Sequence, residues 1–122
     1  MKTIYLIRHA KSSRKYPFLP DFERPLNPRG KQDRYTMAKR LKKMGVVLDK
    51  VFCSPAKRTK KTAKAFIKTF GIDKKDVIYD SEIYNADFSY LDILIGSFDD
   101  AWESVFLIGH HPGLVDIAYR YT

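Results

Sequence analysis

The segment Val51-Phe52-Cys53-Ser54-Pro55 indicates the architecture most directly, because it joins a short apolar run to a helix start. Val51–Cys53 is typical of a buried strand, and Ser followed by Pro is a favoured pair at a helix N-terminus. Apolar residues then recur at helical spacing, and Gly71 follows as a stop. The apolar positions are Ala63, Phe66, Ile67 and Phe70. The segment predicts a strand and then an amphipathic helix with Ser54 as its N-cap.

The same alternation of strand and helix patterns continues on both sides of this segment. Three more short apolar runs predict strands at residues 3–7, 77–79 and 105–108. Helical spacing predicts helices at residues 28–44, 88–95 and 114–121. Strands that alternate with helices form a mostly parallel sheet covered on both faces. We therefore expect an α/β protein with three layers, α/β/α, whose binding crevice lies beyond the carboxyl ends of the strands.

The composition is that of a globular protein rather than a disordered or membrane protein. The 122 residues fit one domain, residues 1–122, and hydrophobic residues make up 44%. No apolar run approaches the roughly 20 residues of a membrane helix, and the N-terminus lacks the features of a signal peptide. The single cysteine, Cys53, excludes an internal disulfide and fits a reducing compartment. We expect a cytoplasmic protein with no membrane partner.

Charge is distributed unevenly along the sequence. Residues 1–75 carry a net charge of +17 and residues 76–122 carry −8, for a total of +9. A basic segment of this size indicates an anionic partner, such as a phosphate group, a nucleic acid, an acidic protein face or a membrane surface. The aromatic residues fall mostly on apolar helix faces and strands rather than among the lysines. We therefore expect no nucleic-acid partner.

Polar and titratable residues follow each of the four predicted strands. In chain order they are Arg8-His9, then Ser54 and Arg58, then Glu82, then His110-His111. Because the carboxyl ends of parallel strands meet at one edge, we expect these side chains to lie close together. Guanidinium groups such as those of Arg8 and Arg58 suit a tetrahedral phosphate. His9, held by rigid backbone after a strand, is a candidate nucleophile, and His110 is a candidate donor to a phosphoryl oxygen.

Five ordered segments resemble the histidine phosphatase superfamily, most closely its small SixA-type phosphohistidine phosphatases. The segments are Leu6-Ile7-Arg8-His9-Ala10-Lys11-Ser12, Glu23-Arg24-Pro25-Leu26-Asn27-Pro28-Arg29-Gly30, Ser54-Pro55-Ala56-Lys57-Arg58-Thr59 with Thr62-Ala63, Glu82-Ile83-Tyr84, and Gly109-His110-His111-Pro112-Gly113-Leu114. They occur in the family's order and span nearly the whole chain. The resemblance implies a phosphoglycerate-mutase-like fold.

The resemblance also implies a role for each matching residue. His9 becomes phosphorylated, Arg8, Arg58 and His110 form the rest of the phosphate pocket, and Ser12 is counted among the phosphate-binding residues. Water then hydrolyses the phosphohistidine intermediate, with no metal and no cofactor. The implied substrate is a phosphorylated protein, such as a histidine-phosphotransfer domain. A small phosphorylated molecule stays an alternative, because the pocket residues contact only the phosphoryl group.

The sequence departs from the family's pattern in three respects. Ala10 stands where the wider superfamily commonly has glycine, although alanine is frequent in the small branch. The proton-donating acid of the larger members has no direct match; Glu82 is the candidate, with Asp21 and Glu23 in the proline-rich loop 11–28 as alternatives. The resembled domains also continue into a further strand and a closing helix. We therefore expect either a fragment or a C-terminally shortened domain, in which the missing strand exposes a sheet edge or apolar surface.

Other chemistries agree less well with the sequence. Four residues separate Cys53 from Arg58, one fewer than in the loop of cysteine phosphatases, and no Walker spacing occurs. A metal site built from His9, His110 and His111 is disfavoured, because the arginines nearby repel a divalent cation. A basic, non-catalytic binding module for nucleic acid or phosphoprotein stays an alternative, as does an inactive family member. The sequence does not indicate an oligomeric state.

Overall fold

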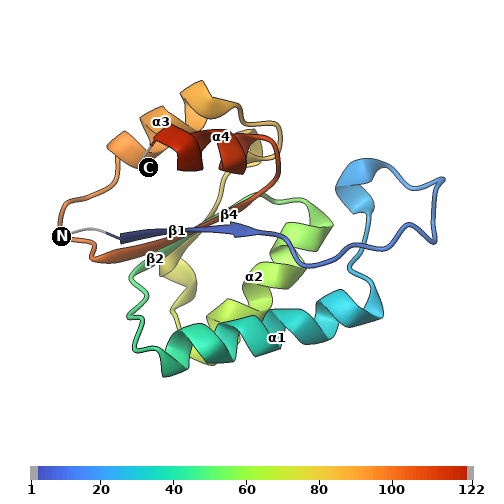
Figure 1. Cartoon of the computed structure of the whole chain (residues 1–122), viewed down its shortest axis with the longest axis horizontal. Helices are drawn as coiled ribbons and strands as arrows, with labels where there is room; N and C mark the ends of the chain where they lie inside the picture. Colours follow the sequence, from blue (N-terminus) through green and yellow to red (C-terminus); the bar gives the residue numbers. More distant parts are fainter. Residues whose placement is uncertain (1–2, 121–122) are drawn as a thin grey trace.

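The structure, a computed structural model, describes residues 3–120. These residues form four strands and four α-helices in alternation (Figure 1). The strands are β1 (Thr3–Arg8), β2 (Lys50–Cys53), β3 (Val77–Tyr79) and β4 (Ser104–Gly109). The α-helices are α1 (Pro28–Lys43), α2 (Lys57–Phe70), α3 (Phe88–Gly96) and α4 (Gly113–Arg120). Three short 3-10 helices lie between them: η1 (Asp21–Glu23), η2 (Lys74–Asp76) and η3 (Ser81–Ile83).

All four strands are parallel, in the spatial order β1-β4-β2-β3. The central strand β4 pairs with β1, where Arg8 lies opposite Gly109, and with β2, where Cys53 lies opposite Ile108. This register brings the carboxyl ends of the three strands to one edge of the sheet. Among the described residues β1 pairs on one side only, so it forms one lateral edge and β3 forms the other.

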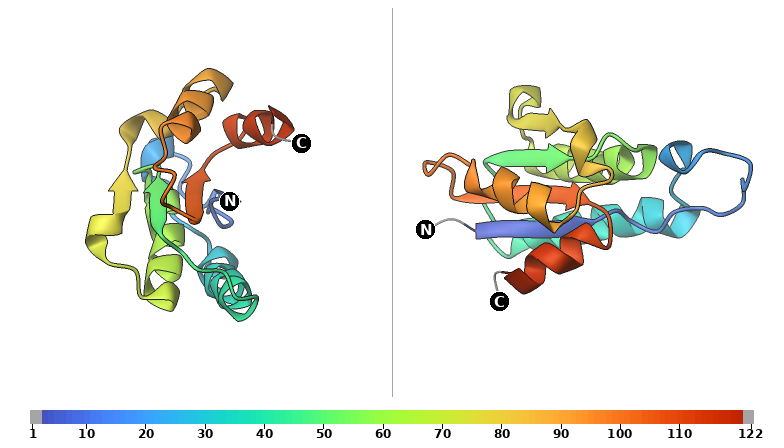
Figure 2. Two further views of the ribbon diagram at one scale, coloured as in Figure 1. Left: turned by 90° about the vertical axis from the view of Figure 1, so that its left-hand side faces the viewer. Right: turned by 90° about the horizontal axis from the view of Figure 1, so that it is seen from above.

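Helices cover both faces of the sheet, with α1 and α2 on one face and α3 and α4 on the other (Figures 1 and 2). The side chains of β4 alternate between the two cores, as the pleat of a strand requires. Val105 and Leu107 pack with apolar residues of α3 and α4, whereas Phe106 and Ile108 pack with those of α1 and α2. The expected three-layer α/β/α architecture with a parallel sheet is confirmed.

The helix α1 begins at Pro28, as predicted, and its N-terminus packs closely against the loop after β1. The side chain of Asn27 caps the helix by accepting a hydrogen bond of 2.7 Å from the backbone N–H of Gly30. A Cβ atom at Gly30 would lie 2.2 Å from the carbonyl oxygen of Lys11. Glycine at this position therefore lets α1 approach the backbone two residues after His9.

The prediction that Ser54 caps α2 is wrong. The helix begins at Lys57, two residues later than the Ser-Pro pair suggested, because Ala56 is still in an extended conformation. Ser54 is fully buried, and its hydroxyl accepts hydrogen bonds from the ring of His110 at 2.8 Å and from the N–H of Ala56 at 3.3 Å. The hydroxyl thus joins β4 to the start of α2. At the other end Gly71, with φ of 65°, ends the helix as predicted.

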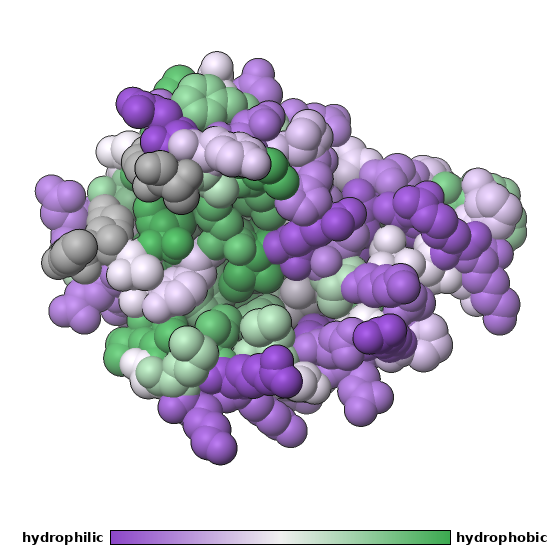
Figure 3. Space-filling model, in the orientation of Figure 1, coloured by the Kyte–Doolittle hydropathy of each residue, from purple (hydrophilic) through white to green (hydrophobic). Residues whose placement is uncertain are grey.

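Loop 11–28 projects beyond the carboxyl edge of the sheet (Figures 1 and 2). An antiparallel bridge between Ser12 and Leu26 closes its base, and η1 lies inside it. Hydrophilic side chains surround this loop in Figure 3, whereas apolar side chains gather along β1 between the two helical layers. No helix within residues 3–120 is both long enough and apolar enough to cross a membrane.

Candidate active site

The carboxyl end of β1 leads directly to His9, whose surroundings fix its tautomer. Nδ1 of His9 lies 2.7 Å from the carbonyl oxygen of Ala10, which can only accept, so Nδ1 carries the proton and Nε2 keeps its lone pair. Burial lowers the pKa of His9 below 6.5, and the charges of Arg58, Arg8 and Arg24 lower it further, against the opposing effect of the hydrogen bond to Ala10. His9 is therefore a neutral imidazole with a free nitrogen, the state that a nucleophile requires.

His110 follows β4 and lies beside His9, with 5.5 Å between the two ring centroids. Its Nε2 donates a hydrogen bond of 2.8 Å to the hydroxyl of Ser54. Its Nδ1 lies 3.3 Å from Nη2 of Arg58, which can only donate. Burial, followed by the charge of Arg58, lowers the pKa of His110 to about 4. The second imidazole is therefore also neutral near pH 7.

Arg58, in the first turn of α2, connects this pair of histidines to the projecting loop. Its guanidinium is buried, and it donates to the carbonyl oxygen of Asp21 at 2.7 Å and to the carboxylate of Asp21 at 2.9 Å. One turn further along α2, Thr62 accepts from the N–H of Ala10 at 2.9 Å and donates to the carbonyl oxygen of Arg58 at 2.7 Å. The same helix thus positions both the arginine and the backbone beside His9.

Asp21 is bound by a second group, the hydroxyl of Tyr84, which donates to its carboxylate at 2.5 Å. The ring of Tyr84 also lies against the ring of His110, with 5.4 Å between centroids. The hydrogen bond from Tyr84 is the main cause that lowers the pKa of Asp21 below 3.8, and Arg58 adds to it. Asp21 is therefore ionised at neutral pH, which suits an anchor for Arg58.

Two buried guanidinium nitrogens have no hydrogen-bond partner among residues 3–120, namely Nε of Arg24 and Nε of Arg58. Arg24 also pairs with Asp21, at 3.4 Å between Nη2 and Oδ1, and its charge lowers the pKa of His9. Leaving a buried donor without an acceptor costs about 1–3 kcal/mol. Phosphate oxygens are strong acceptors for guanidinium groups, so the arginines supply both the charge and the spare donors that such an anion uses.

Arg8 and Ser12, which the sequence assigned to phosphate binding, lie at the margin of this cluster. Arg8 is exposed and lines a cavity of about 150 Å³ between β1, α1 and α2. Its positive charge nevertheless lowers the pKa of both His9 and His110. Ser12 pairs with Leu26 at the base of the loop. Their contact with phosphate stays a prediction.

Glu82 lies in η3 and is exposed to solvent. It lies close to Tyr90, rather than to the two histidines or Arg58. The hydroxyl of Tyr90 donates a hydrogen bond to Asp80. This hydrogen bond is the main cause that raises the pKa of Tyr90 to about 12, and the nearby Glu82 raises that pKa further. Among the three acids considered from the sequence, Asp21 is the one that contacts Arg58. Which of Glu82, Asp21 and Glu23 donates a proton stays a prediction.

The other candidate nucleophiles and metal-ligating side chains do not belong to this cluster. Cys53 is buried, and burial raises the pKa of its thiol. His111 is exposed. In the part of the chain that the structure describes, no three His, Cys, Asp or Glu side chains are grouped so that they could hold a metal ion.

The sequence named Ser54 and Asp21, but it did not predict the contacts that hold Arg58 and His110 in place. These contacts are made by the Asp21 carboxylate, the Ser54 hydroxyl and the Tyr84 hydroxyl and ring. Arg24 was likewise missed as a charge beside His9. Arg24 and Tyr84 lie inside segments that carry the family resemblance, which is the one feature of the sequence that could have singled them out.

Comparison with known proteins identifies the class to which this arrangement belongs. Two histidines with lowered pKa values and the buried Arg58 lie together at the carboxyl edge of a parallel α/β sheet. The sequence profile of the histidine phosphatase superfamily (branch 1) matches residues 4–93, from β1 into α3. The chain belongs to the histidine phosphatase superfamily, and phosphatase activity is the chemistry that this membership supports.

Solved structures extend the similarity over nearly the whole chain. A protein from Agrobacterium tumefaciens, assigned as the phosphohistidine phosphatase SixA, is 30% identical with a TM-score of 0.83; the match covers 96% of this chain and 74% of that one. A protein from Nakamurella multipartitia with the same assignment is 26% identical with a TM-score of 0.82, covering 97% and 64% of the two chains. A phosphoglycerate mutase from Plasmodium falciparum, 19% identical, has a TM-score of 0.66, covering 96% and 66%.

These matches confirm the phosphoglycerate-mutase-like fold and show that the chain is shorter than its relatives. It spans 64% to 74% of the lengths of these three proteins. No curated protein sequence matches it.

Proposed function

We propose that this protein removes the phosphoryl group from phosphohistidine on a protein, through a covalent phosphohistidine intermediate on His9. One observation carries the proposal: neutral His9, neutral His110 and buried Arg58 converge at one edge, with 5.5 Å between the two rings and 3.3 Å between Arg58 and His110. Similarity to the Agrobacterium protein assigned as a phosphohistidine phosphatase supports the substrate class.

In the first step Nε2 of His9 attacks phosphorus in line with the leaving group. The bond between phosphorus and Nε2 forms while the bond between phosphorus and the substrate nitrogen breaks. The electron pair leaves with that nitrogen, which takes up a proton. The arginines offset the charge on the phosphoryl oxygens; at an effective dielectric of about 20, one cation 4 Å from an anionic oxygen contributes roughly 4 kcal/mol.

In the second step water attacks the phosphorylated His9 and releases inorganic phosphate. A bond between phosphorus and the water oxygen forms, and the bond between phosphorus and Nε2 breaks. The hydrogen bond from Nδ1 to the Ala10 carbonyl oxygen holds the ring in the same tautomer throughout. We propose that the cycle uses no metal ion and no cofactor.

Glu82 is our proposed proton donor for the first step, with Asp21 and Glu23 as alternatives. The lowered pKa of Asp21 makes its carboxyl a weak source of protons at neutral pH. A substrate imidazole is also a good leaving group, so the contribution of the acid is small. Replacing Glu82 by Gln should reduce turnover of an aryl phosphate more than turnover of phosphohistidine.

The proposed setting is cytoplasmic signal transduction, with a histidine-phosphotransfer domain as the partner. The buried single thiol of Cys53 fits a reducing compartment. The basic surface formed by residues 1–75 suits an acidic or phosphorylated protein.

A trapping experiment tests the intermediate. The protein is mixed with a histidine-phosphotransfer domain that carries radioactive phosphate, and the reaction is quenched in parallel with acid and with base. We expect a covalent label that base preserves and acid removes. We also expect His9→Ala to lower turnover by about 1,000-fold or more. A label that survives acid but not base, or full turnover by His9→Ala, would exclude the mechanism.

The competing functions give different results in the same assay. A higher kcat/KM for an aryl phosphate than for the phosphorylated protein would indicate a small-molecule phosphomonoesterase. Loss of activity with a chelator would contradict the metal-free step. Absence of turnover on both substrates, with tight and salt-sensitive binding of nucleic acid, would indicate a binding module instead.

A further inference from the structure

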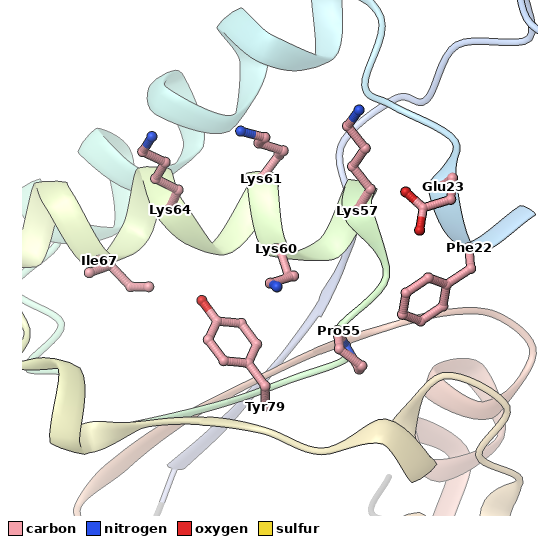
Figure 4. A pocket seen from close by; sticks show the side chains of 9 residues that line it. All are labelled: Phe22, Glu23, Pro55, Lys57, Lys60, Lys61, Lys64, Ile67 and Tyr79. Atoms are coloured by element: carbon pink, nitrogen blue, oxygen red, sulfur yellow. The ribbon is translucent and has the colours of Figure 1, made fainter.

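The proposed chemistry leaves unused a groove along α2, which we call the lysine groove. It has a volume of about 420 Å³ and is lined by Phe22, Glu23, Pro55, Lys57, Lys60, Lys61, Lys64, Ile67 and Tyr79 (Figure 4). Its four lysines occupy positions i, i+3, i+4 and i+7, so they form one stripe along two turns of the helix, about 10 Å long.

Within residues 3–120 the lysines of this groove have no carboxylate partners. All four are exposed, and none forms an ion pair with another residue between 3 and 120. Lys60 lies over the ring of Tyr79, with Nζ 5.4 Å from its centroid. Glu23 is the one acidic residue of the lining. The groove therefore presents a concentrated positive charge that no ion pair among the described residues neutralises.

Apart from Glu23, the rest of the groove lining is apolar or aromatic. Phe22 and Pro55 line one end, Ile67 lies at the other, and Tyr79 lies opposite the lysine stripe (Figure 4). An occupant that matches this surface carries several negative charges together with an apolar side chain. Each ring already has a partner: Lys60 lies over the ring of Tyr79, and the ring of Phe22 packs edge-on against that of Tyr84 with 5.1 Å between centroids. Nucleic acid, which needs open rings between the cations, fits this surface less well.

The groove begins next to the catalytic cluster. Lys57 is adjacent to Arg58 in the chain, and Phe22 is adjacent to Asp21, the partner of Arg58. A protein whose phosphorylated side chain reaches His9 therefore passes close to the end of the groove. A segment beside that side chain can lie along α2 while the phosphoryl group is in the site.

We infer that the lysine groove binds an acidic segment, with an apolar side chain among its carboxylates, on the surface of the phosphorylated protein substrate. This inference rests on the proposed function, since it assigns the surface that selects a protein over a small phosphorylated molecule. Exposed ion pairs each change an equilibrium by roughly a factor of two to five, so three lost pairs weaken binding by at least about tenfold.

Direct binding tests the groove without any turnover. The groove variant replaces Lys60, Lys61 and Lys64 by Gln, and its control replaces Lys39, Lys43 and Lys75, which are exposed elsewhere, so both lose the same charge. The probe is a fluorescein-labelled peptide of Glu residues around a central Leu, with single-stranded DNA of equal charge as competitor. We expect the groove variant to bind the peptide about tenfold more weakly than the wild type, and the control less than about twofold more weakly.

Equal losses in both variants, or no binding of the peptide to the wild type, would overturn the inference. So would tighter binding of the DNA that depends on the groove lysines. Kinetics separate this failure from failure of the proposed function. With a phosphorylated histidine-phosphotransfer domain we expect the groove variant to raise KM about tenfold at unchanged kcat, while aryl phosphate hydrolysis stays the same. If the wild type turns over the phosphorylated domain and the groove variant has the same KM, the inference about the groove is contradicted. The proposed phosphatase function is then still supported.

Discussion

At the scale of single residues, the protonation of two histidines is determined by groups that have only one hydrogen-bonding role. The carbonyl oxygen of Ala10 can only accept a hydrogen bond, so the proton of His9 lies on Nδ1. The guanidinium of Arg58 can only donate, so Nδ1 of His110 carries no proton. The lowered pKa values of His9 and His110 keep both rings neutral near pH 7, so the positive charge of the site belongs to the arginines. A neutral pair avoids adding two further cations beside Arg58.

The lowered pKa of His9 predicts how phosphorylation of the protein depends on pH. The reactive form is the neutral ring, so the rate of covalent labelling should fall on the acid side with a midpoint below 6.5. Arg24→Gln removes one of the charges that lower this pKa, so the midpoint should move upward. The measurement is the initial labelling rate from pH 4 to 8 with an aryl phosphate. A midpoint at or above 6.5 in the wild type contradicts the prediction.

Substitution of Asp21 tests whether its carboxylate holds Arg58 in place. In Asp21→Asn the neutral amide replaces the carboxylate that binds Arg58 and Tyr84, and we expect kcat/KM to fall about tenfold, because charge-assisted hydrogen bonds contribute roughly 1.5–3 kcal/mol. The Asp21 charge raises the pKa of His110, so its removal should lower that pKa from about 4. Kinetics and NMR titration of the ring carbons of His110 measure the two effects.

A matched loss of charge far from the site is the control for Asp21→Asn. Glu103 is exposed and precedes β4, at the opposite end of the strand from His110. Glu103→Gln should leave both kcat/KM and the titration of His110 unchanged. Equal effects of the two substitutions would mean that net charge, rather than the contact with Arg58, is responsible.

At the scale of elements, the close approach of α1 to the loop after β1 depends on Gly30. A Cβ atom there would lie 2.2 Å from the backbone oxygen of Lys11, so the helix or the loop must move in Gly30→Ala. Overpacking of this kind costs about 1–3 kcal/mol in the free energy of unfolding, which urea denaturation measures. Gly96→Ala is the control, because its Cβ meets open space, and it should change stability by less than about 1 kcal/mol.

The elements also show why the sequence predicted part of the site and not the rest. His9, Arg58 and His110 were predicted because each follows a strand, and parallel strands end at a common edge. Asp21 and Arg24 come from loop 11–28, which has no periodicity, so nothing local indicates where their side chains lie. The order β1-β4-β2-β3 was likewise outside the prediction, because apolar runs identify strands but not their neighbours.

The start of α2 illustrates a different limit. The pair Ser54-Pro55 has a strong local preference for a helix N-terminus, but the hydroxyl of Ser54 forms a tertiary hydrogen bond with His110 instead. Local propensity is a weak prior that packing overrides, and it does so here at a residue that supports the site.

At the scale of the whole molecule, the same neutral histidines make the free energy of unfolding depend on pH. The folded protein keeps His110 neutral down to about pH 4, whereas the unfolded chain protonates it near 6.5. The unfolded state therefore binds more protons in this window, and stability should fall as the pH is lowered from about 6.5 to about 4. His9 adds to this loss in the same direction. Asp21, with a pKa below 3.8, stabilises the fold above that pH and loses its contribution only in more acidic solution.

Urea denaturation from pH 4 to 8 measures this dependence and separates the histidines. His110→Gln should flatten the slope between pH 6.5 and 4, because the substituted side chain takes up no proton in either state. The loss of slope should stay below the roughly 1.4 kcal/mol per pH unit of one full proton, since the ring is only partly buried and solvent screens its charges. His111→Gln is the control, because His111 is exposed. A slope unchanged in His110→Gln, or flattened equally in His111→Gln, would show that the pH dependence does not arise from His110.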